Sequence, residues 1–463
     1  MIKDFITEED LALFTSGSRF ALAPVLLKEE MENTIATFDL LIRELPKTRN
    51  FFVFAGLEHV SEYLLHLRFN SRQLAWLKHS FNFSPEIMNY FKKFRFSGDM
   101  WAMPEGTLAF PNEPVIKITA PIMEAQIIEM FLINSVYLQT ILASKIARFI
   151  HAANGKPAAI GFNRSYGTDA AMKSARINEI FGNTNSLALY HFKHGSHVFS
   201  AGTFHYLIMA FENEIDAFRA YLKHMKGKGY VLIDTYDSIR GIKNFIRVAK
   251  ELERSGAKAT GIQLDSGDLY KLSVTARTML DDAGLSYIKI FAMGNLDEWK
   301  VEELEKKQAP IDVYAGVTEL LTPSDAPTIE LVYKLCELHS GNKIFPKMKT
   351  SAKKMSLPGR KQIFRLLKNG KYTQDVIGLE NERIGGKRLL IPIIKRGKLV
   401  YRYPSAKQIR NHYQSEIKKF DHAIFSIHRQ KKYRIQISSA LKRLIKQTKF
   451  ALRAVHHDTD LDI

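Results

Sequence analysis

Val231-Leu232-Ile233-Asp234 is the first of four short apolar runs between residues 231 and 319 that end near Asp, Gly or Thr, each followed by a helical pattern. The other three runs are TGI (260–262) leading to Asp265, IKIF (288–291) leading to Gly294, and IDV (311–313) leading to Thr318. Apolar runs of this length are typical of parallel strands buried on both faces. In barrels built from βα units, residues just past the carboxyl ends of the strands line the active site. We therefore predict an α/β enzyme whose site lies at this edge.

The length and composition are those of a globular protein with two or three domains, because 463 residues of 46% hydrophobic content exceed one typical core. Cys336 is the only cysteine, which excludes an internal disulfide and a cysteine-based zinc cluster. The first residues, MIKDF, lack the pattern of a secretory signal, and no uninterrupted apolar run reaches the roughly 18 residues of a membrane span. We expect a cytoplasmic protein without membrane association.

The positive charge is concentrated in the last quarter of the chain. Residues 346–463 contain 29 Lys and Arg against 8 Asp and Glu, whereas the remainder, with 38 against 40, is nearly neutral. A solvated basic face on a folded module is the simplest interpretation. A field that attracts an anionic substrate and a nucleic-acid or acidic-membrane surface are the alternatives, and we regard nucleic-acid binding as unlikely.

The turn LDSGD (264–268) is the sharpest local signal. Asp265 and Asp268 stand three residues apart, and such a pair suits sugar hydroxyls or a hydrated Mg²⁺. Gly267 would let a backbone approach closely. The alternative is an ordinary turn in which Asp268 caps the following helix. The residues alone leave both interpretations open.

Several motifs follow one another in a characteristic order. They are VLIDTYD (231–237), LDSGDL (264–269), FAMGNLDE (291–298), VYKL (332–335) and PGRKQIFR (358–365), with further segments at ATFDL (36–40), AGLE (55–58), GTDAAMK (167–173) and, as a weak match, YRI (433–435). In sequence and order they resemble the nicotinate phosphoribosyltransferase family. Together they cover nearly the whole chain. Several ordered motifs over this length are specific, although any single one would be weak.

The resemblance implies an irregular TIM-like α/β barrel over residues 121–345. A second α+β domain would be formed by residues 1–120 together with the basic segment 346–463. The family forms nicotinate mononucleotide from nicotinate and phosphoribosyl pyrophosphate with ATP hydrolysis, in NAD salvage. Homodimers with sites at the subunit boundary, Mg²⁺ and ATP as co-substrate are expected for this reason.

The resemblance also assigns roles to individual residues at the predicted edge. Asp265 and Asp268 match positions that face the ribose and the metal, so Mg²⁺ is expected near them. Thr318 matches a phosphate-binding threonine. Asp234, Ser266, Gly267 and Gly294 complete the set of expected catalytic and substrate-binding residues. The chemistry would be positional and electrostatic, because the ribosyl centre gains positive charge near carboxylates.

His205, in FHYLIMAF (204–211), aligns with the histidine that the family phosphorylates when ATP hydrolysis is coupled to nucleotide synthesis. A neutral imidazole nitrogen is a competent nucleophile near pH 7. The alternative is that this histidine, one of 15, is an ordinary structural residue beside an apolar run.

The departures from the family pattern gather where the base should bind. Ser18 and Ile160 stand where relatives carry aromatic residues that contact the pyridine ring. Asn163 replaces the first of two arginines and leaves only Arg164, and Gln263 replaces an arginine implicated in nicotinate binding. Loss of stacking and of a bidentate partner for a carboxylate weakens recognition of nicotinate. Transfer to another base such as nicotinamide and a catalytically impaired, ligand-binding homologue therefore remain open as alternatives.

Overall fold

The structure, a computed structural model, describes residues 6–196, 202–351 and 354–459. The chain forms two compact units. Unit 1 contains Met1–Ile141 and Thr328–Ile463, and unit 2 is the continuous segment Leu142–Pro327. Unit 1 is therefore built from both ends of the chain. The boundaries between the units lie at residues 141/142 and 327/328, whereas the sequence places them at 120/121 and 345/346.

A seven-stranded sheet with the order β13-β12-β1-β5-β3-β17-β18 organises unit 1. Its strands are β1 (Ile35–Ile42), β3 (Asp99–Ala102), β5 (Pro114–Pro121), β12 (Leu331–Ser340), β13 (Lys343–Pro346), β17 (Ile391–Lys395) and β18 (Lys398–Leu399). Strand β1 pairs antiparallel with β5 on one side and with β12 on the other. Segments about 300 residues apart thus share one sheet, as Ile35 and His339 do.

Two smaller sheets and most of the short helices complete unit 1. The sheets have the orders β16-β14-β15-β19 and β2-β4. Their strands are β14 (Lys361–Lys368), β15 (Lys371–Leu379), β16 (Lys387–Arg388), β19 (Ile435–Ile437), β2 (Phe52–Val53) and β4 (Leu108–Ala109). The helices are η1 (Glu8–Leu13), α1 (Gly17–Ala21), α2 (Ala23–Lys28), α3 (Leu57–His66), α4 (Ser71–Phe81), α5 (Pro85–Lys93), α6 (Ile122–Ile127), α16 (Ala406–Ile417), η2 (His422–Phe425) and α17 (Ser439–Thr459).

Helix α7 (Glu129–Ala152) is the longest helix of the described chain and runs from unit 1 into unit 2. By length and composition alone it would suffice to cross a membrane, although no uninterrupted apolar run within it reaches the length of a span. However, 67% of its most apolar window is buried inside the protein. That burial is what a core helix shows, because such a helix is apolar all round.

Unit 2 contains a six-stranded sheet with the order β7-β6-β11-β10-β9-β8, in which every pairing is parallel. Its strands are β6 (Ala158–Ile160), β7 (Thr184–Asn185), β8 (Tyr230–Leu232), β9 (Gly261–Leu264), β10 (Lys289–Ala292) and β11 (Val313–Gly316). The first three predicted apolar runs overlap half or more of β8, β9 and β10, whereas IDV (311–313) reaches only the first residue of β11. The predicted α/β fold is confirmed. Strands β9 and β10 are buried along most of their length.

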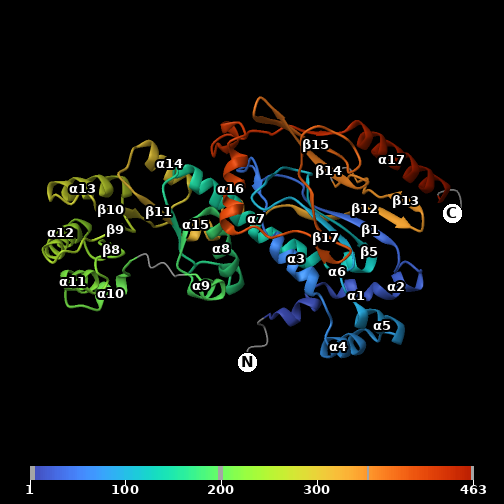
Figure 1. Cartoon of the computed structure of the whole chain (residues 1–463), viewed down its shortest axis with the longest axis horizontal. Helices are drawn as coiled ribbons and strands as arrows, with labels where there is room; N and C mark the ends of the chain where they lie inside the picture. Colours follow the sequence, from blue (N-terminus) through green and yellow to red (C-terminus); the bar gives the residue numbers. More distant parts are fainter. Residues whose placement is uncertain (1–5, 197–201, 352–353, 460–463) are drawn as a thin grey trace. The chain divides into compact units, whose positions relative to one another are not determined.

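Helices alternate with these strands and flank them in Figure 1. They are α8 (Thr168–Phe181), α9 (Ala188–His194), α10 (His205–Met209), α11 (Glu214–His224), α12 (Ser238–Arg254), α13 (Leu269–Asp282), α14 (Glu298–Lys306) and α15 (Thr318–Leu321). Several begin at a side-chain cap from the preceding strand's loop. Asp237 caps α12, Asp268 caps α13 and Asp297 caps α14, each accepting a backbone N–H two or three residues into the helix. These caps explain why acidic residues recur after the strands.

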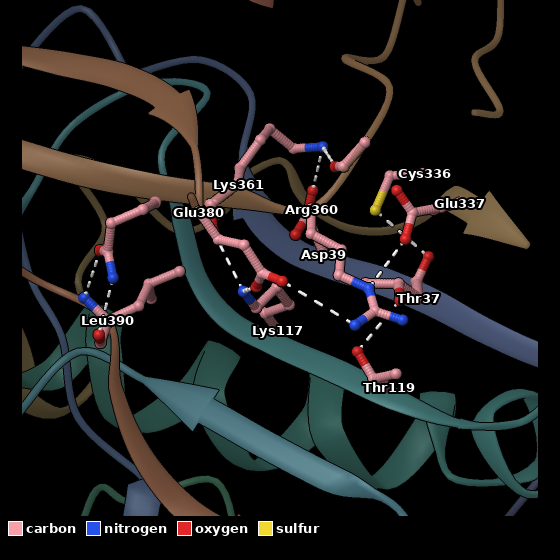
Figure 2. A network of polar contacts seen from close by, with 12 residues as sticks. Thr37, Asp39, Lys117, Thr119, Cys336, Glu337, Arg360, Lys361, Glu380 and Leu390 are labelled. Carbon is pink, nitrogen blue, oxygen red and sulfur yellow. Dashed lines mark hydrogen bonds and ion pairs between the residues drawn. The ribbon is translucent and has the colours of Figure 1, made fainter. Parts of the chain in front are cut away.

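Two of the family-like motifs, ATFDL and PGRKQIFR, meet in unit 1, in a buried polar network shown in Figure 2. Lys361, at the start of β14, lies 2.8 Å from a carboxylate oxygen of Asp39 on β1, and both side chains are buried. The Lys361 ammonium also donates to the carbonyls of Leu357 and Gly359. Burial is the largest single influence and would lower the pKa of Lys361, but the attraction and hydrogen bonding of Asp39 and of the neighbouring Cys336 together outweigh it, so the pKa is raised.

Four further side chains extend this polar network. Arg360 binds Glu337 of β12 at 2.8 Å, and Lys117 of β5 pairs with Glu380. Strands from the N-terminal and C-terminal segments are therefore joined by charges as well as by the sheet. Paired charges with several hydrogen bonds are the form in which ionised groups tolerate burial.

Candidate active site

The parallel register of unit 2 brings the predicted residues to one edge of the sheet. Leu232 of β8 pairs with Gln263 of β9, and Leu264 pairs with Ala292 of β10, which in turn pairs with Tyr314 of β11. Because parallel strands end at the same side, the residues that follow these positions share the carboxyl edge. Asp234, Asp265, Gly294 and Thr318 each lie within a few residues of those ends. We call this group the strand-end rim.

Asp234 organises the turn after β9. One of its carboxylate oxygens accepts a hydrogen bond from the backbone N–H of Asp265 at 3.1 Å and from the Ser266 hydroxyl at 2.6 Å. Its other oxygen, Oδ1, is buried and has no hydrogen-bond partner in the part of the chain that the structure describes. Leaving a buried carboxylate oxygen without a hydrogen-bond donor costs free energy. A water or a ligand that binds this oxygen would remove that cost.

Asp265 and His205 face each other across the strand-end rim. The His205 Nε2 lies 3.7 Å from Asp265 Oδ2, with the two side chains 46% and 32% exposed. Burial raises the pKa of Asp265, the neighbouring Asp234 raises it further, and His205 opposes the change. Desolvation together with a like charge is the arrangement that marks functional carboxylates.

His205 is the first residue of the short helix α10, and a hydroxyl fixes its other ring nitrogen. His205 Nδ1 and Thr235 Oγ1 are 3.1 Å apart. Thr235 follows directly on Asp234, so one turn holds both the carboxylate and the residue that orients the histidine. We did not single out Thr235 from the sequence, although it stands within the VLIDTYD motif; its role depends on a contact 30 residues away.

Gly294 is required by the fold of the strand-end rim itself. It has φ of +91°, and a Cβ at this position would lie 2.1 Å from the carbonyl oxygen of Asp265. The glycine therefore permits close approach of two strand-end turns, in addition to any approach to phosphate. Gly267, with φ of +78°, supplies the left-handed residue of the turn after β9.

Asp268 is used by the helix that follows it. Its side chain accepts the backbone N–H of Lys271 at 3.1 Å and lies 3.3 Å from the Lys271 ammonium. The backbone hydrogen bond from Lys271 is the main cause of the lowered pKa of Asp268. The capping interpretation is thus observed, and the Asp268 side chain is exposed.

The carboxylates of the strand-end rim fit a magnesium ion that is largely held by substrate. Among the described residues, no group of three or more His, Cys, Asp or Glu side chains lies close enough to hold a metal alone. Mg²⁺ commonly keeps several waters and binds through one or two carboxylates plus substrate phosphates. Asp265 and the unpaired Oδ1 of Asp234 provide such a donor set.

The other predicted residues occupy different surroundings. Gln263 is buried on β9 and its amide donates to the Met293 sulfur at 2.6 Å. Ile160 is buried at the end of β6, where it pairs with Gly316. Thr318 begins α15, and Arg164 is exposed in the loop after β6. Ser18 lies on α1 and is exposed; it belongs to unit 1, whereas the strand-end rim belongs to unit 2.

Sequence comparison finds one family at both ends of the chain. The model of the nicotinate phosphoribosyltransferase (NAPRTase) N-terminal domain matches residues 13–137, and that of the C-terminal domain matches residues 386–445. A nicotinate phosphoribosyltransferase of Mycobacterium tuberculosis is 39% identical over 394 residues, which are 84% of this chain and 83% of that protein. The nicotinate phosphoribosyltransferase of Bacillus subtilis is 34% identical over 397 residues, 84% of this chain and 80% of that protein.

Two solved structures share the fold. Human nicotinic acid phosphoribosyltransferase superposes with a TM-score of 0.83 at 22% identity, covering 94% of this chain and 99% of that chain. The nicotinate-nucleotide pyrophosphorylase of Pyrococcus furiosus superposes with a TM-score of 0.72 at 22% identity, covering 90% of this chain and 99% of that chain. At this identity the likeness concerns the fold alone, and it agrees with an α/β unit plus a second domain.

Proposed function

The chain belongs to the nicotinate phosphoribosyltransferase family, and from this premise we propose that it transfers the phosphoribosyl group of phosphoribosyl pyrophosphate to nicotinate. The product is nicotinate mononucleotide, in NAD salvage. The observation that carries the proposal is the facing pair of Asp265 and His205 at the strand-end rim, in a chain 39% identical to a named member of the family over most of its length.

Asp265 is the residue that we assign to the reacting sugar. Its carboxylate is partly buried, its pKa is raised by that burial, and it lies at the strand ends where the substrate would enter. A carboxylate in such a site stabilises positive charge that develops at the ribosyl centre as pyrophosphate leaves. Asp234 holds the backbone of Asp265 by accepting its N–H, and the Ser266 hydroxyl donates to the same Asp234 oxygen.

Magnesium would be held by Asp265 and by Asp234 Oδ1, together with the phosphates of the substrate. Bound there, it would neutralise charge on the departing pyrophosphate. Thr318, at the start of α15, remains our candidate for a phosphate contact, since it follows the end of β11 at the same edge. Gly294 keeps the two turns close enough for one ligand to touch both.

His205 is the proposed acceptor of a phosphoryl group from ATP. Thr235 holds Nδ1, so Nε2 is the ring nitrogen directed toward the strand-end rim. Attack of Nε2 on the terminal phosphorus of ATP would form a P–N bond and release ADP, and later hydrolysis would release phosphate. His205→Ala should therefore abolish stimulation by ATP while leaving some ATP-independent product formation. Unchanged stimulation by ATP in this variant would contradict the assignment.

A second candidate function differs in the base that receives the phosphoribosyl group, and one residue specifically supports it. Gln263 is buried, uncharged and engaged with Met293, so it offers no cation to the carboxylate of nicotinate. Transfer to nicotinamide is the alternative that this amide favours. Gln263→Arg should improve the affinity for nicotinate, whereas tight binding of nicotinate by the unaltered protein would show that another cation, with Arg164 the first candidate, takes this role.

A direct assay separates these functions. Purified protein is incubated with phosphoribosyl pyrophosphate, Mg²⁺ and either nicotinate or nicotinamide, with and without ATP, and the nucleotide product is identified by mass. We expect nicotinate mononucleotide as the main product and its rate to rise with ATP. Exclusive formation of the nicotinamide nucleotide would establish the second candidate, and ligand binding without any product would establish an impaired homologue.

Assembly and location are also part of the proposal. We expect a homodimer, as in the family, and a cytoplasmic protein whose single cysteine stays reduced. The burial of the free Cys336 thiol is compatible with that compartment. Size-exclusion chromatography with light scattering tests the dimer.

A further inference from the structure

Helix α17 lies on the surface of unit 1, and one side of the helix packs against that unit. Leu441 is fully buried and Thr448 is buried. Leu444 lies so close to the backbone of Gly359 that a Cβ there would be 2.7 Å from its side chain. Helix α17 contacts β15 and lies beside it in Figure 1. The apolar side of this amphipathic helix therefore packs against unit 1 and cannot insert into a lipid bilayer.

The outer face of α17 is a stripe of cations. Lys442, Lys446, Lys449 and Arg453 follow one another at intervals of four, three and four residues, so all four lie on one side of the helix. With a rise of 1.5 Å per residue the stripe is roughly 16 Å long. We call it the α17 stripe.

The α17 stripe lacks the counter-charges that other surface lysines of this protein have. On α14, Lys306 pairs with Glu302 and Lys307 pairs with Glu303, each one turn away. Residues 439–454 contain five Lys and Arg and no Asp or Glu. Among the side chains that the structure describes, which do not include that of Asp458 on the same helix, no carboxylate forms an ion pair with the four stripe residues. Four adjacent unpaired cations repel one another and attract a polyanion.

An exposed aromatic ring stands beside the α17 stripe. The Phe450 side chain is 77% exposed, one residue after Lys449 and one helical turn from both Lys446 and Arg453. Cations that follow a phosphate backbone, with an aromatic ring on which a base stacks, are the means by which proteins bind single strands without sequence preference. A duplex presents no free base face to such a ring. The combination favours a single strand over other polyanions.

Contrary to our expectation from the composition, we propose that α17 is a binding site for single-stranded nucleic acid, an activity independent of phosphoribosyl transfer. The four stripe cations contact successive phosphates and Phe450 stacks on a base. At about 3.4 Å per nucleotide the stripe would span roughly five nucleotides of a stacked strand.

The test uses the whole protein and fluorescence anisotropy of labelled 20-nucleotide oligo(dT) and oligo(U) between 50 and 200 mM NaCl. Four phosphate contacts predict that the logarithm of the binding constant falls with the logarithm of salt with a slope of about −3. Changing Lys442, Lys446, Lys449 and Arg453 to Glu together should weaken binding at least about 30-fold and flatten that slope. Phe450→Ala should weaken binding about 5- to 100-fold and leave the slope unchanged.

A matched control changes the same net charge elsewhere in unit 1. Arg72, Lys78, Lys92 and Lys93 are exposed cations on α4 and α5, and their joint change to Glu should leave most of the binding intact. Both quadruple variants should keep full phosphoribosyltransferase activity. The proposal is overturned by absence of saturable binding at 50 mM NaCl, by an equal loss in the control, or by equal affinity for duplex with no effect of Phe450→Ala. Preferential binding to phosphatidylserine vesicles would overturn it as well.

Discussion

The buried polar network of unit 1 and the strand-end rim of unit 2 use the same kinds of residue for opposite purposes. In the network, the Asp39 and Lys361 side chains are 2% and 1% exposed and their charged atoms are 2.8 Å apart. At the rim, Asp265 and His205 remain about a third to a half exposed and are 3.7 Å apart. The network charges form a close, buried ion pair, although Asp39 Oδ1, like Asp234 Oδ1, is buried without a hydrogen-bond partner among the described residues. The rim charges are farther apart and partly exposed. A close buried ion pair indicates a structural role, and a longer, partly exposed pair indicates a functional one.

The largest expected effect breaks the network side of this comparison. Lys361→Met leaves the Asp39 carboxylate buried without its partner, and removal of one member of such a pair costs about 3–5 kcal/mol. Urea denaturation should show that loss in the free energy of unfolding. The double variant with Asp39→Asn should recover part of it, because no buried charge then remains. A loss below about 1 kcal/mol for Lys361→Met would mean that water reaches this pair.

The second prediction breaks the strand-end rim side. Asp265→Asn keeps the shape of the side chain but removes the charge that faces the reacting sugar, so kcat should fall by about 10²–10³-fold with the fold intact. Asp268→Asn is the matched control, since that carboxylate serves α13 and should lose only a few-fold in rate. Equal losses in the two variants, measured by steady-state kinetics, would place Asp268 in the chemistry after all.

The third prediction tests whether the geometry of the strand-end rim depends on close backbone packing. Gly294→Ala must push the Asp265 carbonyl away, so it should cost about 1–3 kcal/mol beyond the strain of its positive φ and also lower kcat. Gly284→Ala is the control for that strain, because its φ is +70° and its nearest neighbour would be 3.8 Å away. Thermal unfolding and kinetic measurements on both variants test this prediction. Equal changes in stability and kcat in the two variants would show that the two turns are free to separate.

The smallest expected effect concerns pH and the stability cost of the strand-end rim. The pKa of Asp265 is raised in the folded protein, mainly by burial. Ionised Asp265 therefore lowers the free energy of unfolding, and this loss is complete above the pKa of the folded state. The loss disappears below the pKa of the unfolded state, near 4. Asp265→Asn should therefore raise Tm at pH 7.5 despite abolishing activity. The gain should shrink as the pH falls toward 4. A Tm difference that does not change with pH would indicate that the carboxylate is not desolvated.

Sequence periodicity was enough to predict β8 to β11 and the edge at which they end, because buried parallel strands are apolar throughout and their loops carry Asp and Gly. It was not enough to distinguish the roles of the individual residues at that edge. Asp265 and Asp268 look alike in LDSGD, yet one faces His205 and the other caps α13. The difference arises from contacts distant in sequence, and these also produced the role of Thr235.

The charges of unit 1 were harder still to interpret from the sequence. In PGRKQIFR they read only as a family motif, since basic residues in a basic segment are ordinarily solvated. In the structure Arg365 is fully buried against Asp375, as Lys361 is against Asp39. Their partners come from other strands, so no local pattern could have separated them from the exposed lysines nearby.

The antiparallel pairing of β1 with β12 has a consequence during synthesis. Strand β1 emerges from the ribosome early, but its neighbour lies about 290 residues later, which at 5–20 residues per second is a wait of roughly 15 to 60 s. Throughout that interval one edge of β1 is exposed and able to pair with another chain. The continuous segment of unit 2 meets no such delay. A nascent chain of this protein would therefore carry a finished domain flanked by an unfinished one, and the unfinished half is where chaperones would be needed.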